Sequence, residues 1–133
     1  MTDALERLIE AVEAGEFTLN GDPSIPAHLG QLIDDALGDK ADLWADLVGA
    51  DAGSMDDART LHEVLLPGWT ACVGQNAHHG DWNAFVRLAQ DGAITREHWG
   101  GTYDNAARAW LLAILRAKLA EADNPTMRDD GAD

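Results

Sequence analysis

The residues of this chain best suited to chemistry are histidines, one cysteine and many carboxylates. His78, His79 and Asp81 lie within one short segment, and His98 follows in the same half of the chain. Adjacent histidines in an extended segment point to opposite faces, and the His-x-His and His-x3-His spacings that aim two rings at one ion are missing. We therefore expect an exposed turn here, and we predict no metal site and no cofactor.

Cys72 is the single cysteine, which excludes an internal disulfide. It falls on a predicted strand, where a lone cysteine is commonly a small buried hydrophobe. A nucleophilic thiol needs a nearby base and a positive environment, but the surrounding sequence is neutral or acidic. The glycine patterns of nucleophile elbows and of phosphate- or dinucleotide-binding loops are also missing. We expect a protein that is not an enzyme and has no catalytic residues.

Acidic residues dominate the charge of the 133-residue chain, with 24 Asp and Glu against 9 Lys and Arg and a net charge of −15. Residues 1–66 hold 15 of these acids. Such a charge repels phosphate backbones and anionic lipids, so we expect no direct binding of nucleic acid or membrane. The N-terminus is unlike a signal peptide and no apolar run is long enough to span a bilayer, which predicts a cytoplasmic protein.

Four aspartates in the acidic half follow one another at spacings of 4, 3 and 4 residues. They are Asp35, Asp39, Asp42 and Asp46. On nearly continuous helices they would share one side and imitate phosphates toward a basic groove, with Trp44 as an aromatic anchor. Glu6, Glu10 and Glu13 form a second row. The alternative, given equal weight, is a solvated face that keeps the protein soluble.

Helical spacing of apolar residues predicts three short helices in the acidic half, each ending at a glycine. They cover the segment before Gly15, Pro26 to Gly38, and Ala41 to Val48. Ser54 is the predicted N-cap of a fourth helix, which Pro67-Gly68 ends. That helix is expected to bury Met55, Ala58, Leu61 and either Val64 or Leu65.

The apolar pattern then changes from helical to alternating. Segments near Trp69–Val73, Trp82–Ala89 and Ala93–Trp99 predict a three-stranded antiparallel meander, with a hairpin turn at Asp91-Gly92. Gly100-Gly101 is expected to end the third strand, and Thr102 or Asp104 to cap a last helix. That helix is predicted to pack on the sheet through Trp110, Leu111 and Ile114. Four tryptophans, Trp69, Trp82, Trp99 and Trp110, are assigned to the core.

The segment from Ser54 to Asp123 resembles the phage ABA-sandwich family of small bacteriophage and prophage proteins. The residues that carry the likeness are the helix Asp56–His62, the strand entry Leu66–Trp69 and the closing helix Asn105–Ala117. The resemblance implies a phage origin and an α-β-α order of layers. It brings no catalytic residues.

These observations predict a single α+β domain over residues 1–123, in which residues 1–53 form an acidic helical region and residues 54–123 a helix-meander-helix core. Residues 124–133 are expected to be a disordered tail. The predicted function is that of a phage accessory protein that binds a basic host or phage protein. An anti-CRISPR-like inhibitor that mimics nucleic acid toward a host defence protein is its concrete form. The alternatives are a small-ligand binder with a pocket between sheet and C-terminal helix, and a structural or assembly component.

Overall fold

The computed structural model describes residues 2–14, 31, 35–36, 44–76, 78–102 and 105–123. The elements, in chain order, are α1 (Thr2–Glu13), α3 (Trp44–Asp51), α4 (Met55–Leu65), β1 (Thr70–Gln75), β2 (Trp82–Gln90), β3 (Ala93–Thr102) and α5 (Ala106–Asp123). The predicted α+β class and the antiparallel meander are confirmed. The predicted helix from Pro26 to Gly38 and the tail lie almost entirely outside the described residues.

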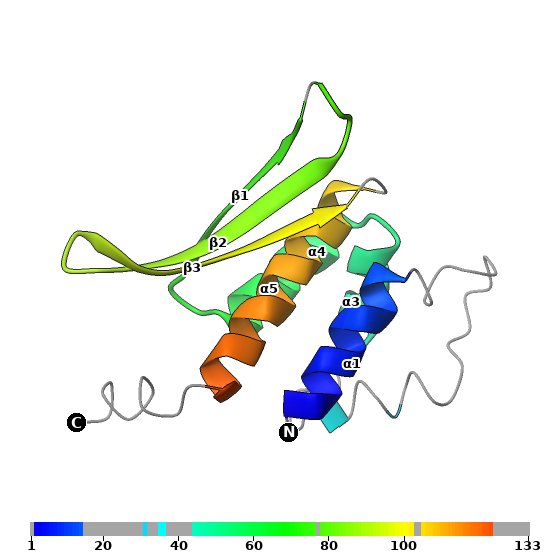
Figure 1. Cartoon of the computed structure of the whole chain (residues 1–133), viewed down its shortest axis with the longest axis horizontal. Coiled ribbons are helices and arrows are strands. Elements are labelled where there is room, and N and C mark those ends of the chain that lie inside the picture. The colour runs from blue at the N-terminus through cyan, green and yellow to red at the C-terminus, as the bar shows by residue number, and fades with distance from the viewer. Residues whose placement is uncertain are drawn as a thin grey trace.

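The sheet has the order β1-β2-β3, so β1 and β3 are its two edges (Figure 1). Asp91 and Gly92 both adopt positive φ, 55° and 83°, between the paired residues Gln90 and Ala93. Positive φ at both central residues is the geometry of a type I′ hairpin, as the Asp-Gly pair predicts. The register between β2 and β3 shifts once, at Leu88/Ala89, where the sheet is irregular.

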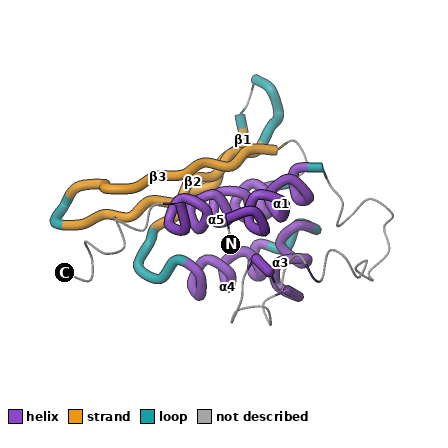
Figure 2. Tube along the Cα trace, turned by 60° about the horizontal axis from the view of Figure 1, so that its bottom comes forward, coloured by secondary structure: helices purple, strands orange, loops and turns teal. Residues whose placement is uncertain are grey.

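The described helices α1, α3, α4 and α5 all lie on one side of the sheet, and the order of layers differs from the expected α-β-α (Figure 2). The sheet comes first, then α5 with α1 beside it, then α3 and α4. The reason is the composition of α5, whose residues 111–115 are all buried. A helix that is apolar all round needs cover on both sides, and here the sheet covers one side and the other helices cover the rest. The opposite face of the sheet has no helix against it among the described segments.

Gly100 brings α5 against the sheet. The two glycines do not end the third strand as expected, because β3 runs through both of them to Thr102. Gly100 is buried, and a Cβ atom there would lie 2.3 Å from the carbonyl oxygen of Ala109 and 2.6 Å from the backbone nitrogen of Ala113. The missing side chain therefore lets the helix backbone approach the strand closely.

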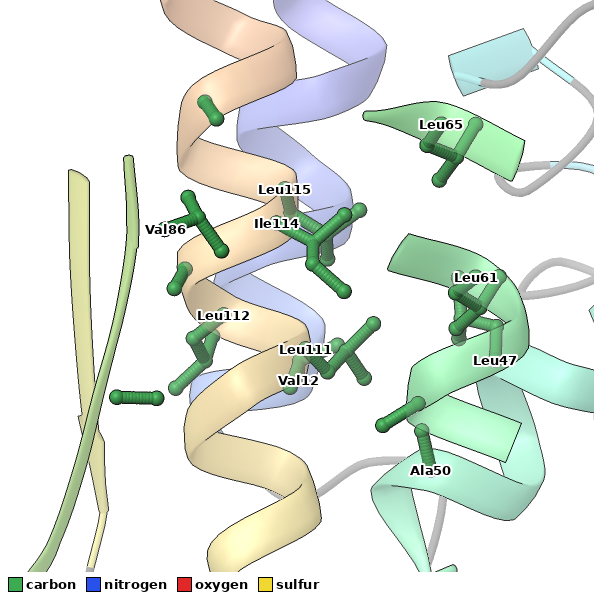
Figure 3. Packing of buried hydrophobic residues seen from close by; sticks show 14 of the residues in the cluster. Val12, Leu47, Ala50, Leu61, Leu65, Val86, Leu111, Leu112, Ile114 and Leu115 are labelled. Carbon is green, nitrogen blue, oxygen red and sulfur yellow. The ribbon is translucent and has the colours of Figure 1, made fainter. Parts of the chain in front are cut away.

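The side of α5 that meets the sheet is not the predicted one. Leu112 lies beside Val86 of β2, whereas Leu111 and Ile114 point away from the sheet toward the other helices (Figure 3). Trp110 contacts His62 of α4, with ring centroids 5.6 Å apart. The prediction was wrong because apolar residues surround α5, so helical periodicity could not distinguish its two sides.

The residues that begin and end the helices were predicted only in part. Ser54 caps α4 as predicted, since its side chain accepts a hydrogen bond from the backbone N–H of Asp57. The cap of α5 is Asn105 rather than the expected Thr102 or Asp104, because Asn105 Oδ1 accepts a hydrogen bond from Arg108 N at 2.7 Å. Gly49 does not end the third predicted helix, because α3 starts at Trp44 and continues to Asp51.

The helix before Gly15 buries its helically spaced apolar residues, and the predicted core of α4 is confirmed in part. Residues Leu5, Leu8, Ile9 and Val12 are buried in α1. In α4, Ala58, Leu61 and Leu65 are buried as expected. Of the two alternatives, Leu65 is the buried one and Val64 is exposed, whereas Met55 is exposed contrary to the prediction and His62 takes a buried position.

Candidate functional site

The uncovered face of the sheet, here called the outer face, carries large side chains where an exposed face usually carries polar ones. Phe85 of β2 is paired with Trp99 of β3 on one side and with Cys72 of β1 on the other. Because side chains alternate along a strand, these three share one face, while Ala84 and Val86 point to the buried face. Trp99 is 48% exposed, so its assignment to the core was wrong.

Trp99 is at the centre of a small cluster, which we call the Trp99 patch: Phe85, Arg87, Glu97 and Trp99. The rings of Phe85 and Trp99 lie 5.0 Å apart and tilted by 52°. The guanidinium carbon of Arg87 lies 3.7 Å from the centroid of the Phe85 ring, a cation-π contact. Glu97 accepts hydrogen bonds from Trp99 Nε1, at 2.8 Å, and from Arg87 Nε. These contacts hold the exposed indole in one orientation.

The pKa of the Glu97 carboxyl is held below its ordinary value of 4.5, first by the hydrogen bond from the Trp99 indole and then by that from Arg87. Glu97 is therefore ionised at neutral pH and offsets the charge of Arg87. The patch has no net charge, although the whole chain carries −15.

An open hollow of about 350 Å³ lies beside the patch on the outer face. The residues around it are Cys72, Gly74, Gln75, Asn76, Asn83, Phe85 and Trp99. Cys72 is exposed here, contrary to the expected buried position, because β1 is an edge strand and position 72 faces outward. Its partner across the ladder is the aromatic residue Phe85.

The aspartate array predicted to bind a partner is only partly visible. Asp39 and Asp42 lie outside the described residues, and so does the side chain of Trp44, whose backbone begins α3. Asp35 is exposed and accepts a hydrogen bond from Gln31 Nε2 at 2.9 Å. Asp46 is half-buried in α3. The array therefore stays a prediction.

The second carboxylate row lies on α1, where Glu6, Glu10 and Glu13 are all exposed. Glu13 accepts a hydrogen bond from Arg116 of α5, and Arg116 also donates to the backbone oxygen of Trp99 at 2.8 Å. One arginine thus links the acidic helix to the strand that carries the patch.

The histidine segment forms a tight turn, closed by backbone hydrogen bonds from Asn76 N to Asp81 O at 2.8 Å and from Gly80 N to Asn76 O at 2.7 Å. Asn76 Oδ1 accepts from the backbone N–H groups of His78 and His79, and both rings are exposed. His98 is elsewhere, on the buried face of β3 against Trp69, with ring centroids 6.3 Å apart. Within the described residues, no three His, Cys, Asp or Glu side chains are grouped so as to hold a metal ion.

Two buried polar clusters were missed from the sequence. In the first, Trp110 Nε1 donates to His62 Nδ1 at 3.2 Å, and His62 Nε2 lies 2.9 Å from the carbonyl oxygen of Trp69. Because an indole N–H only donates, Nδ1 is the acceptor, and the proton on Nε2 is donated to that carbonyl. His62 thus fastens α4 both to α5 and to the start of β1.

The second cluster joins the end of α3 to the start of α5. Arg108 Nε lies 3.0 Å from Asp51 Oδ1, and both side chains are almost fully buried. Arg108 and Asn105 also donate to the backbone oxygen of Asp51 at 3.3 Å. Both clusters lie between helices, and each residue is bonded within the fold, so we assign them structural roles.

The predicted ligand pocket between sheet and C-terminal helix receives no support, since Gly100 lies in close contact with Ala109 and Ala113 there. Among the described helices, none combines the length and the apolar character needed to cross a membrane. Comparisons of the chain with protein-family models, with curated proteins and with solved structures gave no match, so the resemblance to the phage ABA-sandwich family stays a prediction.

Proposed function

We propose that this protein is a non-enzymatic binding module whose protein partner docks on the Trp99 patch. The observation that carries the proposal is the exposed indole of Trp99 on a sheet face that no described helix covers. Tryptophan and arginine are the residue types that dominate binding energy at protein interfaces. The polar groups of the patch bond to one another, which leaves it as a preorganised packing surface.

The test is a capture experiment with immobilised protein and a bacterial lysate, comparing wild type with Trp99→Ala. A central aromatic anchor contributes roughly 2 kcal/mol or more, so Trp99→Ala should weaken retention of the partner about 30-fold. Ile94→Ala is the matched control, because Ile94 is an equally exposed apolar residue of β3 outside the patch. Equal retention by wild type and Trp99→Ala would refute docking on the patch.

A second candidate follows from the exposed acids of α1, namely binding of a protein with a basic surface. Glu6, Glu10 and Glu13 supply the negative surface, and the predicted site of Trp44, Asp35, Asp39, Asp42 and Asp46 would extend it. In its most concrete form the protein is a phage accessory protein that inhibits a nucleic-acid-binding host defence protein, as an anti-CRISPR does. That form depends on the family resemblance.

Salt separates the two candidates, since charge accelerates encounter and is screened by ions. The acidic candidate predicts that 0.5 M NaCl and the Glu6→Gln/Glu10→Gln variant both slow association. Asp91→Asn, in the β2-β3 turn, is the control for a charge change outside the row. If Glu6→Gln/Glu10→Gln and Asp91→Asn associate at the wild-type rate, the acidic row only solubilises the protein.

A further inference from the structure

The two edges of the sheet differ in how well they are protected against pairing with another strand. β3 carries Arg96, Glu97 and His98 in its middle, pairs with β2 through an irregular register and lies against α5. β1 has the sequence Thr-Ala-Cys-Val-Gly-Gln, with no charge and no proline, and pairs regularly with β2 along its whole length. Charges, prolines and bulges are the usual devices that protect an edge, and β1 has none of them.

The edge of β1 is also open to solvent. All its side chains are exposed except Val73, which is half-buried. Among the described segments, none lies beside β1 on the side away from β2 (Figure 1). Its free backbone N–H and C=O groups can therefore accept a further strand.

We propose that two copies of this chain pair through β1, antiparallel and about a two-fold axis perpendicular to the sheet at Cys72 or Val73, to form one continuous six-stranded sheet. The proposal is independent of docking on the Trp99 patch. The axis passes between the two copies of the residue, which are directly opposite each other, and directly opposite residues share a face. The outer faces of both copies therefore lie on the same side of the joint sheet. Both Trp99 patches then lie on one surface.

The charge distribution leaves the β1 edge as a place where a second copy can dock. A chain of net charge −15 repels its own copies, so it can self-associate only where the contact is neutral and the acids are remote. β1 is uncharged, and the acidic helix α1 lies on the far side of α5 from β1 (Figure 1). With the axis at Cys72 or Val73, small or β-branched residues face one another and no like charges are opposed.

Added salt should strengthen this dimer, whereas it should weaken binding of a basic partner to the acidic surface. Screening weakens the repulsion between two acidic chains, so added NaCl should strengthen the dimer. Sedimentation velocity at 50 and 500 mM NaCl measures this, and we expect a species of twice the 14.3 kDa chain mass that increases with salt. A chain that stays monomeric up to about 1 mM protein at both salt concentrations would overturn the proposal.

Three variants locate the contact. Cys72→Lys places two like charges at the axis and should raise the dimer dissociation constant at least tenfold, although it reduces the net negative charge. Ile94→Lys adds the same charge to the other edge strand and should leave the dimer intact, as should Trp99→Ala. If Cys72→Lys dimerises like wild type, or if Trp99→Ala dissociates the dimer, the contact is not the β1 edge.

Cys72 itself provides a measurement that needs no substitution. Across the proposed axis the two Cys72 Cβ atoms would lie roughly 5 Å apart, or roughly 7–8 Å apart if the axis passes through Val73. Because the chain has one cysteine, a short bis-maleimide can link only these two positions. Efficient formation of a linked dimer at low micromolar concentration is expected, and a yield no higher than in denaturant would contradict the pairing.

Discussion

The buried pair of Asp51 and Arg108 gives the most direct test of how the helical layers are held together. The Asp51 side chain is fully buried and that of Arg108 nearly so, with Nε and Oδ1 3.0 Å apart. Removing one member leaves the other charge buried without its counter-charge, which costs about 3–5 kcal/mol. We therefore expect Asp51→Ala and Arg108→Met each to lower the free energy of unfolding by that amount.

The double variant distinguishes the ion pair from ordinary packing. If the loss in each single variant comes from an uncompensated charge, Asp51→Ala/Arg108→Met should be destabilised by much less than the sum of the two, with a coupling of several kcal/mol. Urea unfolding followed by tryptophan fluorescence at pH 7 measures all four proteins. Losses below about 1 kcal/mol in the single variants, or strictly additive losses, would refute this account.

Two further predictions concern the sheet. Gly100→Ala should lower the free energy of unfolding by at least ~1–3 kcal/mol, because its Cβ would meet the backbone of α5. The matched control in the same urea melts is Gly74→Ala on the outer face, where a Cβ meets nothing within 4 Å. Burial, and after it the charge of Arg96, lower the pKa of His98 below its ordinary 6.5, while Glu121 acts in the opposite direction. Just below pH 6.5 the unfolded chain therefore binds more protons than the folded chain, and the free energy of unfolding should fall as the pH decreases through that range. In His98→Gln this part of the pH dependence should be missing, and identical pH profiles of wild type and variant would contradict it.

Local patterns in the sequence predicted those parts of the fold that depend on neighbouring residues. Alternation in β2 and the Asp91-Gly92 pair define a hairpin without help from distant residues. The capping of α4 by Ser54 likewise needs only residues three positions apart.

The rest depends on residues far apart in the chain. Asp51 and Arg108 are 57 positions apart, and in the sequence each looks like an ordinary surface charge. The burial of His62 depends in the same way on Trp69 and Trp110, neither of which its own helix can indicate. A polar residue in an apolar helical stripe is the only sequence signal, and it does not reveal its partners.

The outer face shows why alternation alone could not identify the candidate site. Alternation in β2 and β3 predicts two sets of residues, and both sets contain large apolar side chains. The buried set is the one that faces α5, and Gly100 lets the α5 backbone approach closely on that side of β3. Trp99, the residue just before Gly100 in the strand, therefore faces solvent. The glycine that makes the core compact therefore also exposes the indole on which the proposed binding function depends.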